Sequence, residues 1–315
     1  MADTLQVNRA RQLVVWLLTD GKPGHRSQLE GLVRALGRHV EVAAHWLDAM
    51  PPAGTAFREW LLRRFTAGLA LPDPDLIVGC GHATHLPLLA AKRARGGLSV
   101  VLMQPSLPLF LFDLCVIPQH DRPRKRANVV ATRGVLNTLR ASVHQKATQG
   151  LFLIGGPSKH HKWDEKTLIT QLRQIVKETP DMHWALTTSR RTPESSLGLL
   201  KSLRGIGVEV IPFEKTDPGW VADAITVSST VWVTEDSVSM IYESLTSGAR
   251  TGLLWVPRHD LDRVTAGVEQ LVKDGLVTPF LVWKDSRTLV KQDKPINEAE
   301  RVAEEILQRL AGWQT

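Results

Sequence analysis

The stretch VWVTEDSVSMIYESLTSG (231–248) has a short apolar run, then a cluster of acidic and hydroxyl residues, and then a helical pattern that ends at a glycine. This order is typical of a parallel strand followed by a loop and a helix. In an open α/β sheet, ligands bind beside the loops at the carboxyl ends of the strands. The stretch therefore predicts one unit of a doubly wound sheet with a ligand site at its loop.

The same alternation of strand-like and helical patterns extends along the chain. In the first half, short apolar runs lie at 13–18, 75–80, 99–103 and 113–118, with helical patterns at 26–38 and 83–95. It starts again with apolar runs at 151–156, 182–189, 208–213, 231–235, 251–257 and 280–283, and a helical pattern at 164–178. Continuous apolar runs that alternate with helices predict a parallel sheet covered on both faces.

We therefore predict the α/β class with two Rossmann-like doubly wound domains, over residues 1–145 and 150–294. The polar stretch 141–150 has little apolar periodicity and is predicted to be a linker. The segment 295–315 predicts a helix with Asn297 as its N-cap and acidic residues in its first turn. We expect this last helix to return to the first domain.

Composition limits the class of protein. The 315 residues are 43% hydrophobic and 23% charged, as in soluble globular proteins. Cys80 and Cys115 offer neither a disulfide framework nor metal-ligand spacing, and the apolar run before Asp20 is too short for a signal peptide or a spanning helix. We expect a cytoplasmic protein. The net charge of +7 indicates an anionic partner, such as a phosphate-bearing substrate, a membrane surface or a nucleic acid.

The loop TDGKPGHRSQ (19–28) is the first of three polar loops that follow predicted strands. Its glycines allow backbone N–H groups to approach an anion or a sugar. Asp20 and His25 are candidates for the general base that deprotonates a hydroxyl, because imidazole titrates near neutral pH. Lys22 is a candidate contact on the acceptor side. The alternative is that His25 only holds the turn.

The second loop is GCGHATHLP (79–87), in which His82 and His85 are three residues apart. A catalytic zinc ion normally has three protein ligands, and the sequence shows no third ligand here. We therefore predict no metal site and expect both histidines to line the acceptor side of the site or to cap a helix.

The third loop, IGGPSKHHKWD (154–164), has features that suit a diphosphate. Gly155 and Gly156 allow close approach of the backbone, and Ser158 and Lys159 offer a hydroxyl and a cation. The loop lacks the spacing of a Walker loop and of GxGxxG, so neither an ATPase nor a dinucleotide-binding protein is indicated.

Two further groups of residues are candidate donor ligands. After the next strand, Arg190 and Arg191 are either a phosphate clamp or solvated surface residues. In the opening stretch, Asp236 can cap the helix, Ser237 and Ser239 can donate hydroxyl hydrogens to a phosphate at the helix N-terminus, and Glu243 can accept hydrogen bonds from ribose hydroxyls. The alternative for this last group is an ordinary capped helix with an exposed glutamate.

Four motifs, in this order, resemble those of the mitochondrial-fission "elongated mitochondria" family, whose bacterial members are often labelled predicted nucleoside-diphosphate-sugar epimerases. They are DGKPGHRSQLEGL (20–32), GGPSKHHKWD (155–164), TTSRRTP (187–193) and TEDSVSMIYES (234–244). The resemblance covers roughly residues 13–260. That family in turn resembles GT-B glycosyltransferases and the related sugar-nucleotide 2-epimerase, which are built from two Rossmann-like domains that face each other across a cleft.

The resemblance implies a role for each domain. The second domain is expected to bind the nucleotide-sugar, and the first to carry the acceptor contacts and the catalytic base. DSVSMIYESLTSG (236–248) is similar to the donor-binding stretch of the lipid-linked N-acetylglucosaminyltransferase of peptidoglycan synthesis, with Glu243 in the place of its ribose-binding glutamate. DGKPGH (20–25) stands where that enzyme has its glycine-rich first loop, but here a lysine and a proline interrupt the glycines.

Two basic segments are candidates for surface contacts. The stretch TAFREWLLRRFTAGLA (55–70) predicts a helix with Phe57, Trp60, Leu61 and Phe65 on one face and Arg58, Arg63 and Arg64 nearby. Such a helix either packs into the core or lies on the inner face of a membrane. The run RPRKR (122–126) has no interleaved aromatic residue, so we predict a solvated loop and no nucleic-acid partner.

The leading interpretation is a metal-independent GT-B glycosyltransferase that transfers a sugar from a nucleotide-sugar to an acceptor hydroxyl, envelope- or lipid-linked. It needs no cofactor beyond the nucleotide-sugar itself. One alternative is a nucleotide-sugar epimerase. The other is a non-catalytic binding protein, associated with division or membranes, that keeps the same fold.

Overall fold

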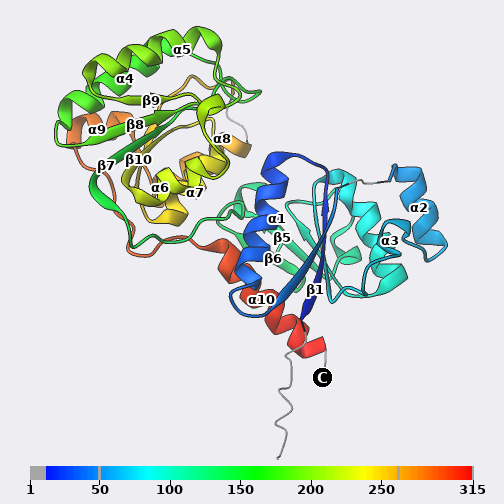
Figure 1. The fold of residues 1–315 in the computed structure, drawn as a ribbon. Helices are drawn as coiled ribbons and strands as arrows, with labels where there is room; N and C mark the ends of the chain where they lie inside the picture. Colours follow the sequence, from blue (N-terminus) through cyan, green and yellow to red (C-terminus); the bar gives the residue numbers. More distant parts are fainter. Residues whose placement is uncertain (1–11, 49–50, 261–262, 314–315) are drawn as a thin grey trace, which may run out of the picture. The chain divides into compact units, whose positions relative to one another are not determined.

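The computed structural model describes residues 12–48, 51–260 and 263–313 and shows two compact units (Figure 1). Unit 1 runs to Thr138 and resumes at Glu298, and unit 2 comprises Leu139–Asn297. Each unit contains one parallel six-stranded sheet, so the α/β class is confirmed. No helix in the described part of the chain has the length and apolar character needed to cross a membrane.

Unit 1 has the strand order β2-β1-β3-β4-β5-β6. Its strands are β1 (Leu13–Thr19), β2 (Val42–Leu47), β3 (Leu76–Cys80), β4 (Leu98–Leu102), β5 (Leu114–Pro118) and β6 (Val129–Thr132), and its helices are α1 (Pro23–Leu36), α2 (Ala53–Leu61), α3 (His85–Arg95) and α10 (Glu298–Trp313). The strand order reverses between β1 and β3. Ligands of doubly wound sheets bind at such a switch point, beside the carboxyl ends of the strands.

The alternating side chains of β1 fill the two faces of this sheet. Val15 and Leu17 lie in a core cluster with residues of α1 and α10, whereas Trp16 and Leu18 lie in a cluster with residues of α3. Figure 1 shows α10 beside α1, and Glu300 of α10 pairs with Arg38 and His39 just after α1. The expectation that the last helix returns to the first domain is therefore confirmed.

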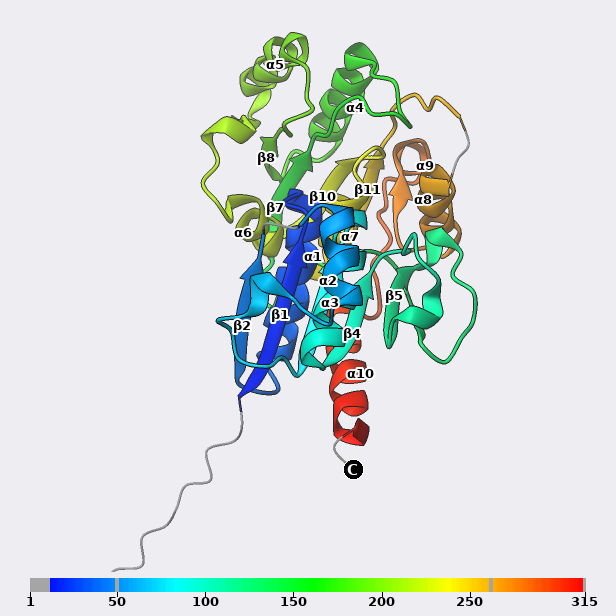
Figure 2. The same cartoon turned by 90° about the vertical axis from the view of Figure 1, so that its right-hand side faces the viewer.

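Unit 2 has the strand order β12-β11-β10-β7-β8-β9, with its switch point between β7 and β10. Its strands are β7 (Lys146–Leu153), β8 (His183–Thr187), β9 (Glu209–Ile211), β10 (Ser228–Thr234), β11 (Arg250–Leu254) and β12 (Thr278–Pro279), and its helices are α4 (Glu165–Glu178), α5 (Glu194–Lys201), α6 (Trp220–Val227), α7 (Val238–Ser247), α8 (Arg263–Lys273) and α9 (Phe280–Ser286). Residues of α4, α5 and α9 pack on one face of the sheet (Figures 1 and 2).

Three local predictions are wrong, and the first concerns residues 280–283, which form the start of helix α9 and not a strand. Phe280 and Trp283 lie one helical turn apart, and both are buried against Trp232, with ring centroids 6.3 and 5.3 Å from that ring. Leu281 and Val282 are exposed. A run of only four apolar residues fits both the helical period of 3.6 residues and the strand period of 2, so it does not distinguish a helix from a strand.

The second wrong prediction is the linker at 141–150, because strand β7 already begins at Lys146. Gln149 and Gly150 pair with β8 inside the sheet. The first three residues of β7 are exposed, and two of them, Lys146 and Thr148, are polar, so a search for apolar runs does not find this part of the strand.

The third is the single apolar face predicted for 55–70. Helix α2 ends at Leu61, and Arg63 then adopts a left-handed φ of 51°. Phe65 is buried beyond that turn, whereas Phe57 and Leu61 on the helix are 54% and 58% exposed.

In two strand pairs of unit 2, a glycine lies opposite a tryptophan. Gly150 pairs with Trp184, and Gly252 pairs with Trp232. A Cβ atom added to either glycine would lie 2.4 Å from the indole ring. The indoles can cover the sheet only because these positions have no side chain.

We expect Gly252→Ala to lower the free energy of unfolding by about 2 kcal/mol, because the buried Trp232 ring must move. Urea unfolding at 25 °C measures the change. Gly198→Ala in α5 is the matched control, since a Cβ there meets nothing within 4 Å, and it should stabilise by about 0.5–1 kcal/mol. Equal stability of the two variants would contradict this account of the strand pairing.

Candidate functional site

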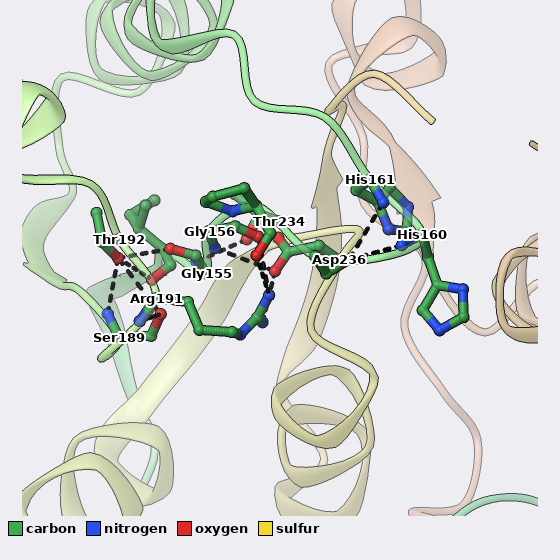
Figure 3. A network of polar contacts seen from close by, with 12 residues as sticks. Gly155, Gly156, His160, His161, Ser189, Arg191, Thr192, Thr234 and Asp236 are labelled. Carbon is green, nitrogen blue, oxygen red and sulfur yellow. Dashed lines mark hydrogen bonds and ion pairs between the residues drawn. The ribbon is translucent and has the colours of Figure 1, made fainter. Parts of the chain in front are cut away.

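Three loops of unit 2 meet around the carboxylate of Asp236, which follows strand β10 (Figure 3). Its Oδ2 accepts a hydrogen bond from the Gly156 N–H at 3.1 Å and pairs with the Arg191 guanidinium at 2.6 Å. Next to it, the Gly155 N–H donates to Thr234 Oγ1 at 2.8 Å. The side chain of Asp236 is fully buried, so this acid ties the loops after β7 and β8 to the end of β10.

Arg191 is bound within the protein in the structure. Besides the Asp236 carboxylate, it donates to the carbonyl oxygens of Gly156 at 2.8 Å and Pro157 at 3.3 Å. Its neighbour Arg190 is exposed, and no described carboxylate pairs with it. Of the two arginines predicted to hold phosphate, Arg190 is therefore the one whose charge is available to a ligand.

The two glycines of the third loop are required by close packing. A Cβ atom on Gly155 would lie 2.2 Å from Asp236 Oδ2, and one on Gly156 would lie 2.1 Å from the carbonyl oxygen of Arg191. The structure thus shows their backbone close to the protein's own chain, and contact with a donor stays a prediction.

The tip of the same loop is shaped by Ser158. Its Oγ accepts hydrogen bonds from the N–H groups of His160 and His161, both at 3.1 Å. The loop then pairs with the segment after β11 through Lys162 N–H to Pro257 O at 2.8 Å. Ser158 therefore builds the turn, while its hydroxyl hydrogen can still point outward. Lys159 is exposed beside it.

No side chain in the described ranges caps the start of helix α7. Ser237 is its N-cap residue but makes no capping hydrogen bond, and Asp236 is not the cap because its carboxylate is held by Gly156 and Arg191. Ser239 in the first turn is exposed. No described side chain therefore hydrogen-bonds to the first backbone N–H groups, which lie at the positive end of the helix dipole, where anions bind favourably.

Glu243 of α7 is half-buried, and among the described residues no group hydrogen-bonds or ion-pairs with its carboxyl. Burial raises the pKa of Glu243 to about 7. A carboxylate in such surroundings is destabilising unless a partner compensates it. The position therefore suits a ligand that donates hydrogen bonds.

The sequence analysis missed a second acid, Glu235, which is buried and has its partners inside the protein. Arg258 donates to Glu235 Oε2 at 2.9 Å and to Glu269 Oε1 at 2.7 Å. Burial raises the pKa of Glu235, and Arg258 offsets part of that rise. The triad fixes the loop after β11 against the end of β10. The sequence offers one signal for this pair: Glu235 stands at the end of the apolar run 231–235, and Arg258 follows the next apolar run, 251–257.

In unit 1, Asp20 and His25 form a dyad at the carboxyl end of β1. His25 Nδ1 lies 2.7 Å from Asp20 Oδ1. Burial acts to raise the pKa of Asp20, but hydrogen bonds from His25 and from the Lys22 backbone outweigh it and hold the pKa below its ordinary value. Asp20 is therefore ionised and accepts the hydrogen on His25 Nδ1. In the neutral form of that ring, Nε2 carries no hydrogen and can accept a hydrogen bond.

Gly81, which follows β3, makes room for this dyad and was not predicted. Its φ is 101°, and a Cβ atom there would lie 2.6 Å from Asp20 Oδ2 and 2.7 Å from His25 Nδ1. The dyad thus sits where β1 and β3 meet, at the switch point of the sheet. Lys22 is exposed, with its Nζ 3.3 Å from Asp20 Oδ2.

His82 and His85 lie at the same edge of the sheet. His85 is buried, with Nδ1 3.0 Å from Ser106 Oγ. Burial and the nearby His82 lower the pKa of His85 to about 4, so its ring is neutral at physiological pH. His82 is exposed, and its ring lies edge-on to the ring of His85, with 5.6 Å between the two ring centroids. His85 is thus a lining residue held in place, and His82 is free to meet a ligand.

One group of possible metal ligands occurs in the described part of the chain, where α10 joins α1. The ligand atoms of His39, Glu300 and Glu304 lie within 4.8 Å of one another. Arg38 pairs with Glu300 there, and its positive charge opposes a cation.

Comparison with known proteins places this architecture. MurG of Acinetobacter baumannii superposes with a TM-score of 0.56 at 12% identity, over 94% of this chain and 99% of that chain. A UDP-GlcNAc 2-epimerase from Neisseria meningitidis bound to UDP-GlcNAc gives 0.57 at 12% identity, over 95% of this chain and 100% of that chain. The fold is therefore the GT-B fold of glycosyltransferases and UDP-sugar epimerases.

Sequence comparison assigns the family. The chain is 22% identical to the uncharacterized protein RP120 of Rickettsia prowazekii (strain Madrid E), over 92% of this chain and 96% of that protein. The model of one family, described as mitochondrial fission ELM1, matches residues 23–310. That match spans most of both units. The chain belongs to the mitochondrial fission ELM1 family.

Proposed function

We propose that unit 2 binds a nucleotide-sugar and that the chain is a metal-independent glycosyltransferase with His25 as its general base. The observation that carries the proposal is Glu243, a half-buried carboxyl without a partner among the described residues, on a helix with an uncapped N-terminus. Ribose presents two neighbouring hydroxyl donors, and one carboxylate can accept from both. Among the described residues, nothing compensates the cost of burying this acid.

The surroundings of α7 suit the diphosphate of the donor. The helix N-terminus contributes N–H groups and a positive dipole, and Ser237 and Ser239 contribute hydroxyls. The exposed side chains of Lys159 and Arg190 contribute cations at the neighbouring strand ends. Asp236, Arg191 and the two glycines take the role of scaffold in this proposal, because their polar groups already bind one another.

In the proposed reaction, His25 Nε2 takes the proton of the acceptor hydroxyl while the oxygen attacks the anomeric carbon. The bond from that carbon to the phosphate oxygen breaks, and the nucleoside diphosphate leaves. Asp20 stabilises the imidazolium through the 2.7 Å contact. The N–H groups of α7 and the nearby cations stabilise the charge of the leaving group. Lys22 and His82 are proposed to contact the acceptor, with His85 supporting His82.

A nucleotide-sugar epimerase is the second candidate, favoured by the match to a 2-epimerase bound to UDP-GlcNAc. It would use the same ribose and diphosphate contacts but no acceptor. A non-catalytic binding protein with this fold is the third candidate, and it needs no dyad.

A thermal-shift panel followed by product analysis separates these candidates. UDP, GDP, CMP and their sugars are tested first, because a ligand bound only by the folded protein must raise the melting temperature. The best nucleotide-sugar is then incubated without acceptor and with candidate hydroxyl acceptors. Transfer that requires acceptor supports the proposal, a new epimer without acceptor supports the epimerase, and the absence of any thermal shift contradicts a donor site.

We expect Glu243→Gln to abolish the nucleotide-induced thermal shift and yet to stabilise the free protein at pH 8. The pKa of Glu243 is raised from about 4.3 when unfolded to about 7 when folded. Below about pH 4.3 the group is protonated in both states, and its contribution to stability is fully present. This stability is lost as the pH rises through the folded pKa of about 7, because the folded protein must then bury a charge. At pH 8 the charged form costs on the order of 3 kcal/mol, which glutamine removes.

Melting curves at pH 5 and pH 8, with and without the best nucleotide, measure both effects. Glu209→Gln, at an exposed glutamate of β9, is the matched control and should change neither quantity. A Glu243→Gln variant that keeps the full nucleotide shift would contradict the ribose contact.

We expect His25→Ala to lower turnover by about 10²–10⁴-fold, because the acceptor hydroxyl then has no general base. Asp20→Asn should act in the same direction, since it removes the charge that stabilises the imidazolium. Both variants should keep the nucleotide thermal shift, which depends on unit 2. Initial rates at saturating donor give the comparison, with His183→Ala at an exposed histidine as control. Full turnover in His25→Ala would remove His25 from the mechanism.

A further inference from the structure

The segment 57–69 of unit 1 exposes four large apolar side chains, and we call this exposed segment the 57–69 surface. It comprises Phe57, Leu61, Leu62 and Leu69, which are 54%, 58%, 58% and 62% exposed. Phe57 and Leu61 are four residues apart on α2 and therefore share a helical face. Apolar side chains gathered in one segment in this way differ from the single exposed residues that any soluble protein carries.

Other side chains make most of the contacts that hold α2 in place, although the Phe57 ring stacks on Trp60 of the same helix. The helix buries Ala56 and Glu59, and it packs against α3, which lies beside it in Figure 1. Glu59 accepts the Thr66 N–H at 3.1 Å, which fixes the segment after the helix. The exposed parts of the four apolar side chains remain available to a partner.

The charge of this surface is positive. Arg58, Arg63 and Arg64 are exposed, and no described carboxylate pairs with them. Glu59 is the only acid between residues 51 and 72, and it is buried. The left-handed turn at Arg63 ends the helix and keeps Leu62 and both following arginines at the surface. The partner should therefore offer an apolar region to the exposed Phe and Leu side chains and negative charges to the arginines beside them.

We propose that the 57–69 surface docks on a lipid bilayer with anionic headgroups. The apolar side chains enter the boundary between headgroups and acyl chains, while the guanidinium groups stay at the level of the lipid phosphates. An anionic bilayer matches both features of this surface, because its headgroups carry negative charge and its acyl chains lie directly beneath them. The proposal concerns a surface of unit 1 and does not depend on the donor site of unit 2.

Vesicle co-sedimentation of the full chain tests the proposal. We expect binding to vesicles that contain phosphatidylglycerol in phosphatidylcholine, no binding to phosphatidylcholine alone, and weaker binding as salt is raised. Leu61→Ser with Leu62→Ser, and separately Arg63→Glu with Arg64→Glu, should each lower the partition coefficient by about tenfold or more. Because these side chains are exposed, both variants should keep the wild-type melting temperature.

The matched control is Leu281→Ser with Val282→Ser on α9 of unit 2, where the side chains are 64% and 54% exposed. This variant should bind vesicles like the wild type. Equal binding to neutral vesicles, or an equal loss in the α9 variant, would overturn the proposal. A third result would also overturn the proposal. In it, light scattering shows that the wild type forms oligomers and that Leu61→Ser with Leu62→Ser is monomeric, while neither protein binds vesicles. The surface would then be an interface between copies of the chain.

Discussion

The loops at the carboxyl ends of the unit 2 strands depend on the hydrogen bond and ion pair of one buried group, the carboxylate of Asp236. A charge without solvent is strongly destabilising unless it is paired and hydrogen-bonded. Here one oxygen binds both the Gly156 N–H and the Arg191 guanidinium, so three loops are fixed to one acid. Because the Asp236 carboxylate binds Gly156 and Arg191, it does not cap α7, and no other described side chain does.

In both units, the candidate functional side chains lie at the point where the strand order reverses. In both, a glycine leaves the space that an acidic side chain occupies there. In unit 1, Gly81 leaves room for the Asp20–His25 dyad, and in unit 2, Gly155 leaves room for Asp236. A methyl group at either glycine would collide with the acid beside it. The fold thus supplies the strand ends, and the missing side chains allow the polar groups to come together there.

The sequence predicts what depends on local pattern. Alternating apolar runs and helical periods predict the two parallel sheets. The segments that follow β1, β7 and β10 contain the dyad, the two glycines and Glu243 of α7. The errors come from contacts distant in sequence. Phe280 and Trp283 are helical because both can reach Trp232, and Arg191 is committed to Asp236 forty-five positions away, a pairing no local pattern reveals. Glu235 and Arg258 were missed for the same reason.

The central claim concerns the start of α7, which no described side chain caps, and the carboxyl of Glu243, which has no partner in the described part of the chain. Together they are proposed to hold a nucleoside diphosphate. A crystal structure of the chain with the nucleotide that stabilises it most tests this claim directly. The account predicts ribose hydroxyls within hydrogen-bond distance of Glu243 and phosphate oxygens facing the first N–H groups of α7. A nucleotide bound elsewhere, or a Glu243 carboxylate that contacts only groups of the protein, would contradict it.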